Sequence, residues 1–203
     1  MLFRSAAADY VVCNSKEIED YYYEREMISI PLGIDSDLFK PIDTKRDKIA
    51  LQLQMDLPIY SYKTIGIFVG SFTEIKGWST MKSIIDRRKD IFWILVTKHD
   101  YEDFHSLNCR VYKKIDQELL TKLLNCSDFF IIPSPSESQC LAAIEANLCN
   151  IPVLMRNTGY FTSLNDKDLR NVGLITETFS DEDINTIINN KDFIIMGLLD
   201  VIL

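Results

Sequence analysis

The 203-residue chain is long enough for one large domain, or one domain with part of another, and too short for two full α/β domains. Its 47% hydrophobic and 26% charged residues, with only 7 glycines and 6 prolines, exclude a largely disordered chain. The net charge of −8 would repel a phosphate backbone, and lysines and arginines form no stripe, so we expect no nucleic-acid partner.

Short apolar runs rich in Val, Ile, Phe and Tyr alternate along the chain with segments that have helical periodicity. The runs do not alternate apolar with polar residues, which is typical of parallel strands buried on both faces. This repetition predicts an α/β fold with a single Rossmann-like parallel sheet and helices on both faces. The predicted strands are Tyr10–Cys13, Met27–Ile30, Thr64–Val69, Phe92–Thr97, Arg110–Tyr112, Phe129–Ile132 and Val153–Met155. The predicted helices are Lys16–Glu24, Lys45–Leu53, Trp78–Arg88, Asp116–Asn125, Gln139–Leu148 and Glu182–Asn189.

The first part of the chain has the character of a separate unit. Tyr10–Cys13 is expected to be the last strand of another domain, with Asn14 and Ser15 capping the helix after it. Residues 30–35, Ile-Pro-Leu-Gly-Ile-Asp, favour an extended crossing followed by a turn. We therefore predict that residues 1–40 are the end of an N-terminal domain with an interdomain linker, and that residues 41–203 form the Rossmann-like domain.

A first candidate site lies in residues 68–77, Phe-Val-Gly-Ser-Phe-Thr-Glu-Ile-Lys-Gly. A buried strand opens through Gly70 into a loop, and Lys76 with Gly77 leads into an amphipathic helix. Unpaired amides and the positive end of the helix dipole favour an anion at such a position, so Lys76 could complete a diphosphate site. The alternative is a lysine that simply faces solvent after a turn.

A second candidate site surrounds Glu137 and Glu145. Glu137 follows a buried strand, and Glu145 is expected two turns inside the next helix, on the face that starts near Ser138. Carboxylates accept paired hydrogen bonds from the vicinal hydroxyls of a ribose or a hexose, and the amides of Ser138 to Leu141 would meet a phosphate. The alternative for Glu145 is exposure at the rim of the helix.

The cysteines and the termini bear on metals, redox state and location. The five cysteines form no C-x-x-C pair and are odd in number, which argues against a disulfide framework and a zinc site. The N-terminus lacks the apolar run of a signal peptide, and Phe193 to Leu203 is about half a membrane span. We expect reduced thiols, a cytoplasmic location, no membrane association, and a terminal helix that packs on the chain or docks on a partner.

Several segments together resemble a known family. Glu137 to Glu145 matches the E-x7-E signature of retaining GT-B glycosyltransferases, and the surrounding sequence resembles their family 4, also called group 1. Other pieces fall in family order. AADYVVCNSKEI resembles the last strand and helix of the acceptor domain, IPLGIDSDLFKP the interdomain linker, VGSFTEIKGW the glycine loop, and VGLITETFSDEDINTII the segment after the donor site.

The resemblance implies a retaining sugar transfer from a UDP- or GDP-sugar, with no metal and no other cofactor. Lys76 would neutralise the donor diphosphate and Glu137 would contact the transferred sugar, so these two form the catalytic set. Glu145 would hold the ribose. The remaining substrate-binding residues would be Gly70, Ser71, Ser138, Gln139, Cys140 and Leu141, the last four through their backbone amides.

The sequence also departs from the family pattern. The family arginine after the loop glycine is Ser71 here, and the family G-F-G after the first glutamate is Ser138-Gln139-Cys140, so donor affinity or turnover is in doubt. Asn150 replaces a glycine, but asparagine tolerates a left-handed backbone and the turn can survive. The candidates for the missing positive charge are Lys98, Lys113, Lys114 and Arg156.

The resemblance implies an acceptor-binding domain, about half of a full enzyme, of which only the end, residues 1–40, is in this sequence. The rest of that domain could be truncated here, naturally absent or on another chain. The expected partners are the nucleotide-sugar donor and either a separate acceptor-domain chain or a second copy. Three functions stay open: a glycosyltransferase, a non-catalytic nucleotide-sugar-binding or interaction module, and another GT-B enzyme such as a nucleotide-sugar epimerase.

Overall fold

The computed structural model describes residues 11–21, 27–42, 44–98 and 104–190. Within these ranges, six parallel strands form one sheet in the order β5-β4-β3-β6-β7-β8. The predicted α/β class with a Rossmann-like parallel sheet is confirmed. The strands are β3 (Thr64–Val69), β4 (Ile91–Thr97), β5 (Cys109–Lys113), β6 (Phe129–Ile132), β7 (Val153–Met155) and β8 (Gly173–Ile175).

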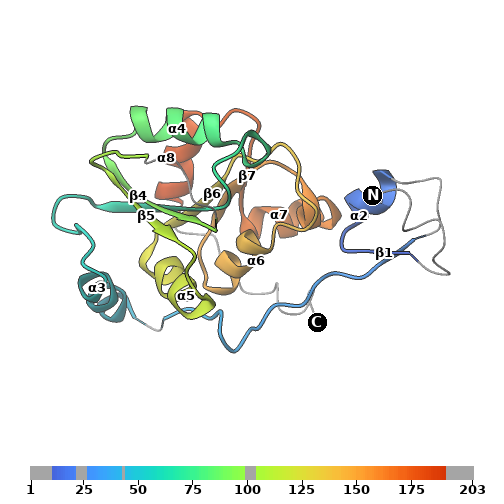
Figure 1. Ribbon diagram of the computed structural model, residues 1–203, viewed down its shortest axis with the longest axis horizontal. Coiled ribbons are helices and arrows are strands. Elements are labelled where there is room, and N and C mark those ends of the chain that lie inside the picture. Colours follow the sequence, from blue (N-terminus) through green and yellow to red (C-terminus); the bar gives the residue numbers. More distant parts are fainter. Residues whose placement is uncertain (1–10, 22–26, 43, 99–103, 191–203) are drawn as a thin grey trace.

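Helices cover both faces of this sheet (Figure 1). In this view α4 and α8 lie above the sheet, α5 and α6 lie below it, and α3 lies beside α5. The helices are α3 (Lys45–Gln54), α4 (Trp78–Arg87), α5 (Gln117–Cys126), α6 (Leu141–Leu148), α7 (Asp166–Val172) and α8 (Asp181–Asn189), with the 3-10 helices η1 (Glu74–Lys76) and η2 (Gly159–Ser163).

The centre of the sheet explains its uninterrupted apolar runs. Every residue of β4 is buried, because helices cover the strand from both sides. Trp93 of β4 packs closely over Gly66 of β3, where an added Cβ would lie 2.5 Å from the indole ring. The same indole meets Phe129 of β6 edge to face. Gly66 is therefore required for close packing rather than for a turn.

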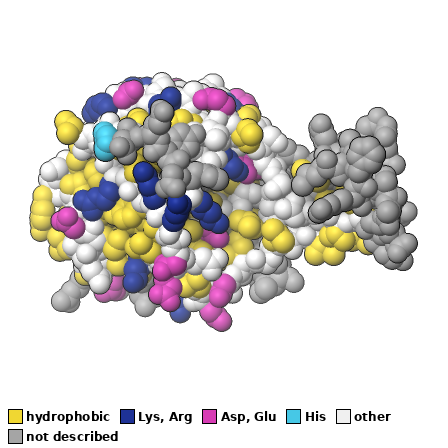
Figure 2. Space-filling view, in the orientation of Figure 1, with side chains coloured by type: hydrophobic (Ala, Val, Ile, Leu, Met, Phe, Trp, Pro, Cys, Tyr) yellow, Lys and Arg dark blue, Asp and Glu magenta, His cyan; other side chains and the backbone are white. Residues whose placement is uncertain are grey.

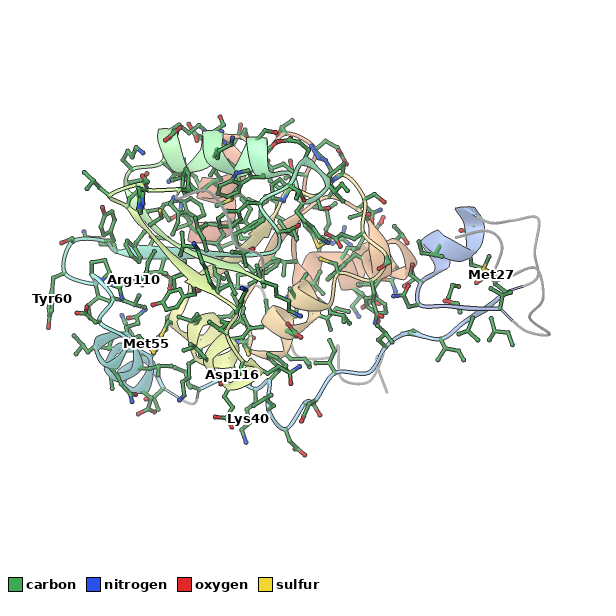
Figure 3. All side chains as sticks on the ribbon, in the orientation of Figure 1. Met27, Lys40, Met55, Tyr60, Arg110 and Asp116 are labelled. Carbon is green, nitrogen blue, oxygen red and sulfur yellow. The ribbon has the colours of Figure 1, made fainter. Side chains whose placement is uncertain are left out.

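Polar side chains fasten α3 to the sheet. Arg110 of β5 donates hydrogen bonds to the backbone carbonyls of Met55, at 3.1 Å, and Asp56, at 2.9 Å. Figure 3 shows Arg110 and Met55 close together at this end of the molecule. Lys48 of α3 pairs with Asp128, just before β6, with 2.7 Å between Nζ and Oδ1. These contacts place α3 firmly although the sequence between α3 and β3 is irregular.

A second, small unit precedes the large sheet. Here β1 (Val12–Cys13) and β2 (Ile28–Ser29) pair in parallel, and α2 (Lys16–Tyr21) contacts η2 of the main body. Figure 1 shows this unit to one side of the molecule, joined by an extended segment. Four of its apolar side chains are about half exposed, namely Val12, Ile28, Ile30 and Leu32. The domain boundary at residue 40 stays a prediction; Phe39, just before it, already packs in the core of the large unit.

The sequence reading missed or misplaced some elements. It did not predict β8, α7 or the two 3-10 helices, all of which are short. The helix predicted from Gln139 begins only at Leu141, because Cys140 adopts a left-handed conformation with φ of 61°. Glu145 therefore lies one turn inside the helix rather than two. Asn150 is left-handed as expected, with φ of 59°. The end of the first predicted helix, Tyr10 and Phe193 to Leu203 lie outside the described residues.

Candidate functional site

The order of the strands marks one position at the sheet edge as special. From β3 the chain runs outward through β4 to β5, and then returns so that β6 pairs with the other side of β3. In open α/β sheets, ligands bind beyond the carboxyl ends of the strands at such a reversal. The loops that follow β3 and β6 carry Lys76 and Glu137, so the fold brings both predicted site residues to this point.

Lys76 and Glu137 form a close ion pair across these two loops. The Lys76 Nζ lies 2.7 Å from Glu137 Oε1 and 2.6 Å from Oε2, although the residues are 61 positions apart. The Glu137 side chain is only 5% exposed, whereas that of Lys76 is 30% exposed. The lysine thus compensates a buried carboxylate while its charge remains accessible from solvent.

Contacts that the sequence reading missed hold the two loops together. Gly77 has φ of 69°, and an added Cβ would lie 2.3 Å from the carbonyl oxygen of Pro133. The Ser134 hydroxyl lies 2.6 Å from the carbonyl oxygen of Ile75, also across the two loops. On the other side, the Glu137 backbone N–H donates to the Thr158 hydroxyl at 2.8 Å. The only sequence signal for this support was the glycine that follows Lys76.

The start of α6 presents a row of unpaired backbone amides. Among the described residues, the N–H groups from Ser138 to Ala142 have no hydrogen-bond partner; the first paired amide is that of Ala143, which donates to Cys140. The left-handed turn at Cys140 separates the loop from the helix axis. Together with the positive end of the helix dipole, these amides suit an anion.

Glu145 has a different environment from Glu137. It is partly buried, and no described residue makes a hydrogen bond or an ion pair with its carboxylate. Burial raises the pKa of Glu145, and the positive charge of Lys98 opposes this rise. Lys98 follows β4, so the carboxyl end of a third strand lies within electrostatic range of Glu145.

The Cys140 thiol marks the centre of the arrangement. Burial raises the pKa of this thiol, the negative charges of Glu137 and Glu145 raise it further, and the positive charge of Lys76 opposes this rise. The three predicted charged residues are therefore all within electrostatic range of one buried thiol. All five cysteines are free, as predicted, so the thiol has no disulfide partner.

The remaining predicted residues take distinct places. A Cβ on Gly70 would lie 3.6 Å from Lys76 Cγ, so the glycine lies against the lysine stem. The Ser71 hydroxyl pairs with the Thr73 hydroxyl at 2.9 Å. Leu141 opens α6, and Ser138 is exposed. The Gln139 side chain is buried and is directed away from these residues, toward the backbone of Leu32.

The candidates for an additional positive charge fall into two groups. Lys98, Lys113 and Lys114 are exposed at the ends of β4 and β5. Figure 2 shows several basic side chains close together on one face of this acidic protein. Arg156 instead pairs with Glu177 at 3.2 Å and lies over the ring of Phe179. Lys98 also lies within electrostatic range of Glu145, so among these candidates it is the one tied to the site residues.

Comparison with known families decides the affiliation of the chain. Residues 56–190 match the family described as glycosyl transferases group 1. The chain belongs to this family. No match was found among curated protein sequences.

Solved structures of glycosyltransferases share the fold. The HepE protein of Anabaena, solved with UDP and glucose, has a TM-score of 0.73 and 16% identity, over 96% of this chain and 58% of that one. A sucrose-phosphate synthase from Thermosynechococcus elongatus gives 0.69 and 22%, over 89% and 48%. The C-terminal domain of a group 1 glycosyl transferase (LpcC) from Francisella tularensis gives 0.63 and 16%, over 84% and 96%. The chain thus spans about half the length of the first two proteins.

The described part of this group 1 family member contains neither a cluster of metal-ligating side chains nor a membrane-spanning helix. In the ranges that the structure describes, no three His, Cys, Asp or Glu side chains are grouped so that they could hold a metal ion. None of the described helices has the length and apolar character needed to cross a bilayer.

Proposed function

We propose that this chain binds a nucleotide-diphosphate sugar and serves as the donor-binding half of a retaining glycosyltransferase. The observation that carries the proposal is the Lys76–Glu137 pair at the β3/β6 reversal, beside the unpaired amides that open α6. A cation, a carboxylate and a row of amides at one point suit a ligand that combines a diphosphate with hydroxyl groups.

The diphosphate would exchange partners with Glu137. When the donor arrives, its phosphates become the anion beside Lys76 and the amides from Ser138 to Leu141, and Glu137 is released to accept hydrogen bonds from the sugar. The same cation and amides then stabilise the negative charge that grows on the leaving diphosphate as the glycosidic bond breaks. The exposed part of Lys76 gives the phosphates a route to the ammonium group.

Glu145 would bind the ribose. A partly buried carboxylate without a hydrogen-bond donor is unfavourable, and two vicinal hydroxyls supply the donors that it lacks. Glu145 follows the amides of Ser138 to Leu141 by one turn of α6, which matches the order of phosphate and ribose in a nucleotide. Binding thereby relieves a local cost, which favours the nucleotide over a simple phosphate.

Other parts of the proposal follow from the family. The donor is a UDP- or GDP-sugar, the reaction retains the anomeric configuration, and no metal takes part, since Lys76 and the amides carry the phosphate charge. Residues 1–40 are the end of an acceptor domain and the linker. The acceptor site belongs to that acceptor domain, whether the domain is part of the same polypeptide, a separate chain or a second copy, and the enzyme works in the cytoplasm.

The test measures nucleotide binding and transfer by the full chain. Calorimetry with UDP, GDP and ADP should give binding of at least one nucleotide, and labelled sugar should pass from the matching donor to an acceptor mixture. Glu145→Ala should weaken nucleotide binding about 10-fold or more by removing a charged hydrogen-bond acceptor. A chain that binds none of these nucleotides at millimolar concentration would contradict the proposal.

A second candidate is a non-catalytic nucleotide-sugar-binding module. It is favoured by Ser71, whose hydroxyl pairs with Thr73 where the family pattern has an arginine. Nucleotide binding without transfer, in the presence of every donor and of a co-purified partner, would support this candidate over the enzyme.

A further inference from the structure

We call the loop between β6 and α6, residues 133–140, the donor loop. The side chain of Gln139 in this loop binds a distant part of the backbone. Its Oε1 accepts a hydrogen bond from the Leu32 N–H at 2.9 Å, and its Nε2 donates to the Leu32 carbonyl at 3.0 Å. The two residues are 107 positions apart. A side-chain amide that satisfies both polar groups of one backbone residue imitates the pairing of two strands, and it fixes that residue in position and orientation.

No other hydrogen bond holds this part of the segment. Among described residues, Pro31, Leu32, Gly33 and Ile34 make no hydrogen bond except the two with Gln139. Before them, Ile30 is bound to β1, and after them Phe39 is anchored in the large core. Leu32 is therefore the single hydrogen-bonded point between the small unit and the large one along this segment.

The backbone of Gln139, unlike its side chain, is part of the proposed anion site. The backbone N–H of Gln139 lies in the row of unpaired amides, between Glu137 and the left-handed Cys140, and its carbonyl accepts from Tyr160 at 3.4 Å. The side chain is 1% exposed, so it has little room to turn independently of its backbone. A shift of the loop around an anion must then move or strain the contact with Leu32.

We infer that Gln139 is a positioning residue that couples occupancy of the donor loop to the orientation of the segment at Leu32. The inference rests on the proposed function for the identity of the ligand. Coupling of this kind is reciprocal: if nucleotide binding tightens the Leu32 contact, then loss of that contact weakens nucleotide binding by the same factor. The small unit that precedes Leu32 thereby senses whether the donor is bound.

The experiment follows the exchange of the Leu32 backbone N–H by NMR in the full chain, with and without UDP. Gln139→Met keeps the volume and removes both hydrogen bonds, and should speed exchange at Leu32 about tenfold. In the wild type UDP should slow this exchange about threefold, and in Gln139→Met it should leave it unchanged. The affinity of Gln139→Met for UDP should be about threefold lower than that of the wild type.

Two further variants separate the coupling from general damage. Gln52→Met removes another buried glutamine, whose Nε2 donates to the Cys126 carbonyl at 2.7 Å, and should change neither Leu32 exchange nor UDP affinity. Leu32→Pro removes the N–H from the other side, leaves the donor loop unchanged in sequence, and should weaken UDP binding to a similar degree.

The outcomes distinguish this inference from the proposed function. Unchanged Leu32 exchange in Gln139→Met would overturn the inference whether or not any nucleotide binds. The coupling would be overturned, and the donor site left intact, if UDP bound the wild type without changing the exchange of the Leu32 N–H. Full UDP affinity in both Gln139→Met and Leu32→Pro would have the same meaning. If UDP does not bind the wild type, the same titration is repeated with GDP and ADP. If none of the three nucleotides binds, both the proposed function and the coupling are overturned.

Discussion

The two glutamates of the candidate site differ in their partners. Glu137 lies in the loop after β6 and Glu145 lies in α6. Glu137 is almost fully buried and has a lysine on both oxygens and a hydroxyl on its backbone N–H. Glu145 is less buried and has no hydrogen-bond or ion-pair partner in the described part of the chain. One acid is paired within the protein before any ligand arrives, and the other has no protein partner in the described part of the chain.

The two carboxylates are suited to different roles in a binding site, namely specificity and affinity. A paired carboxylate keeps its place and costs little in the empty protein, but a ligand must supply a replacement partner before it is released. An unpaired carboxylate makes the empty protein less stable and rewards a ligand that brings donors. The first carboxylate thus favours specificity for an anion joined to a sugar, whereas the second contributes to affinity.

The largest effect is expected from Lys76→Met, which would make Glu137 as unsatisfied as Glu145. The free energy of unfolding should fall by about 2 kcal/mol, less than for a fully buried pair, because the Lys76 side chain is 30% exposed. Nucleotide affinity should fall about 30-fold, since a charged contact to the phosphates is lost. Urea unfolding and calorimetry measure the two effects.

Lys48→Met provides the matched control for this change. Lys48 also pairs with a carboxylate, that of Asp128 at 2.7 Å, and its side chain has a similar exposure of 24%. It should lower stability without changing nucleotide affinity. If Lys76→Met and Lys48→Met bind the nucleotide equally well, Lys76 is only a structural partner of Glu137.

A smaller effect of opposite sign is expected from Glu145→Gln. Replacing the unsatisfied carboxylate by a neutral amide should raise the free energy of unfolding at neutral pH by about 1 kcal/mol. In a chain of this size that is about 2–4 °C in Tm. Nucleotide affinity should fall in the same variant. A variant that is less stable than the wild type at neutral pH would show that Glu145 already has a favourable partner.

The pH dependence of this difference is fixed by the direction of the pKa shift. Burial raises the pKa of Glu145 above its ordinary value of 4.5, so folding favours the protonated form. The stability that protonation contributes is complete below pH 4.5 and is lost as the pH rises through the higher folded pKa. The advantage of Glu145→Gln over the wild type should therefore appear above pH 4.5 and then stay constant. Glu118→Gln, at an exposed position, is the control.

An effect of similar size, on stability alone, is expected at Cys140, which lies between the two regions. Its φ of 61° is unfavourable for any residue with a side chain, so Cys140→Gly should be more stable than Cys140→Ala by about 1 kcal/mol. Thermal unfolding of the two variants measures the difference. At Ala143, inside α6, glycine should instead be less stable than alanine by about the same amount. Equal stability of Cys140→Gly and Cys140→Ala would mean that the left-handed turn does not persist in solution.

The sequence alone was enough to predict the fold class and most elements of the large sheet. Uninterrupted apolar runs such as that of β4 are readable because a strand covered on both faces has no polar side. Glu137, Lys76 and Glu145 could be singled out because charged residues beside buried strands or within an apolar helix are costly without a purpose. Short elements such as β8 and α7 were missed because three to seven residues carry too little periodicity.

Only the tertiary structure decided which of these residues meet. Lys76 and Glu137 touch because β3 and β6 are neighbours, and the pairing of strands depends on packing between segments that are far apart in the chain. Gln139 reads locally as a helix residue, yet its side chain binds Leu32 and the helix starts later. Local patterns record which residues are buried, whereas contacts over 61 or 107 positions are set by the free energy of the whole fold.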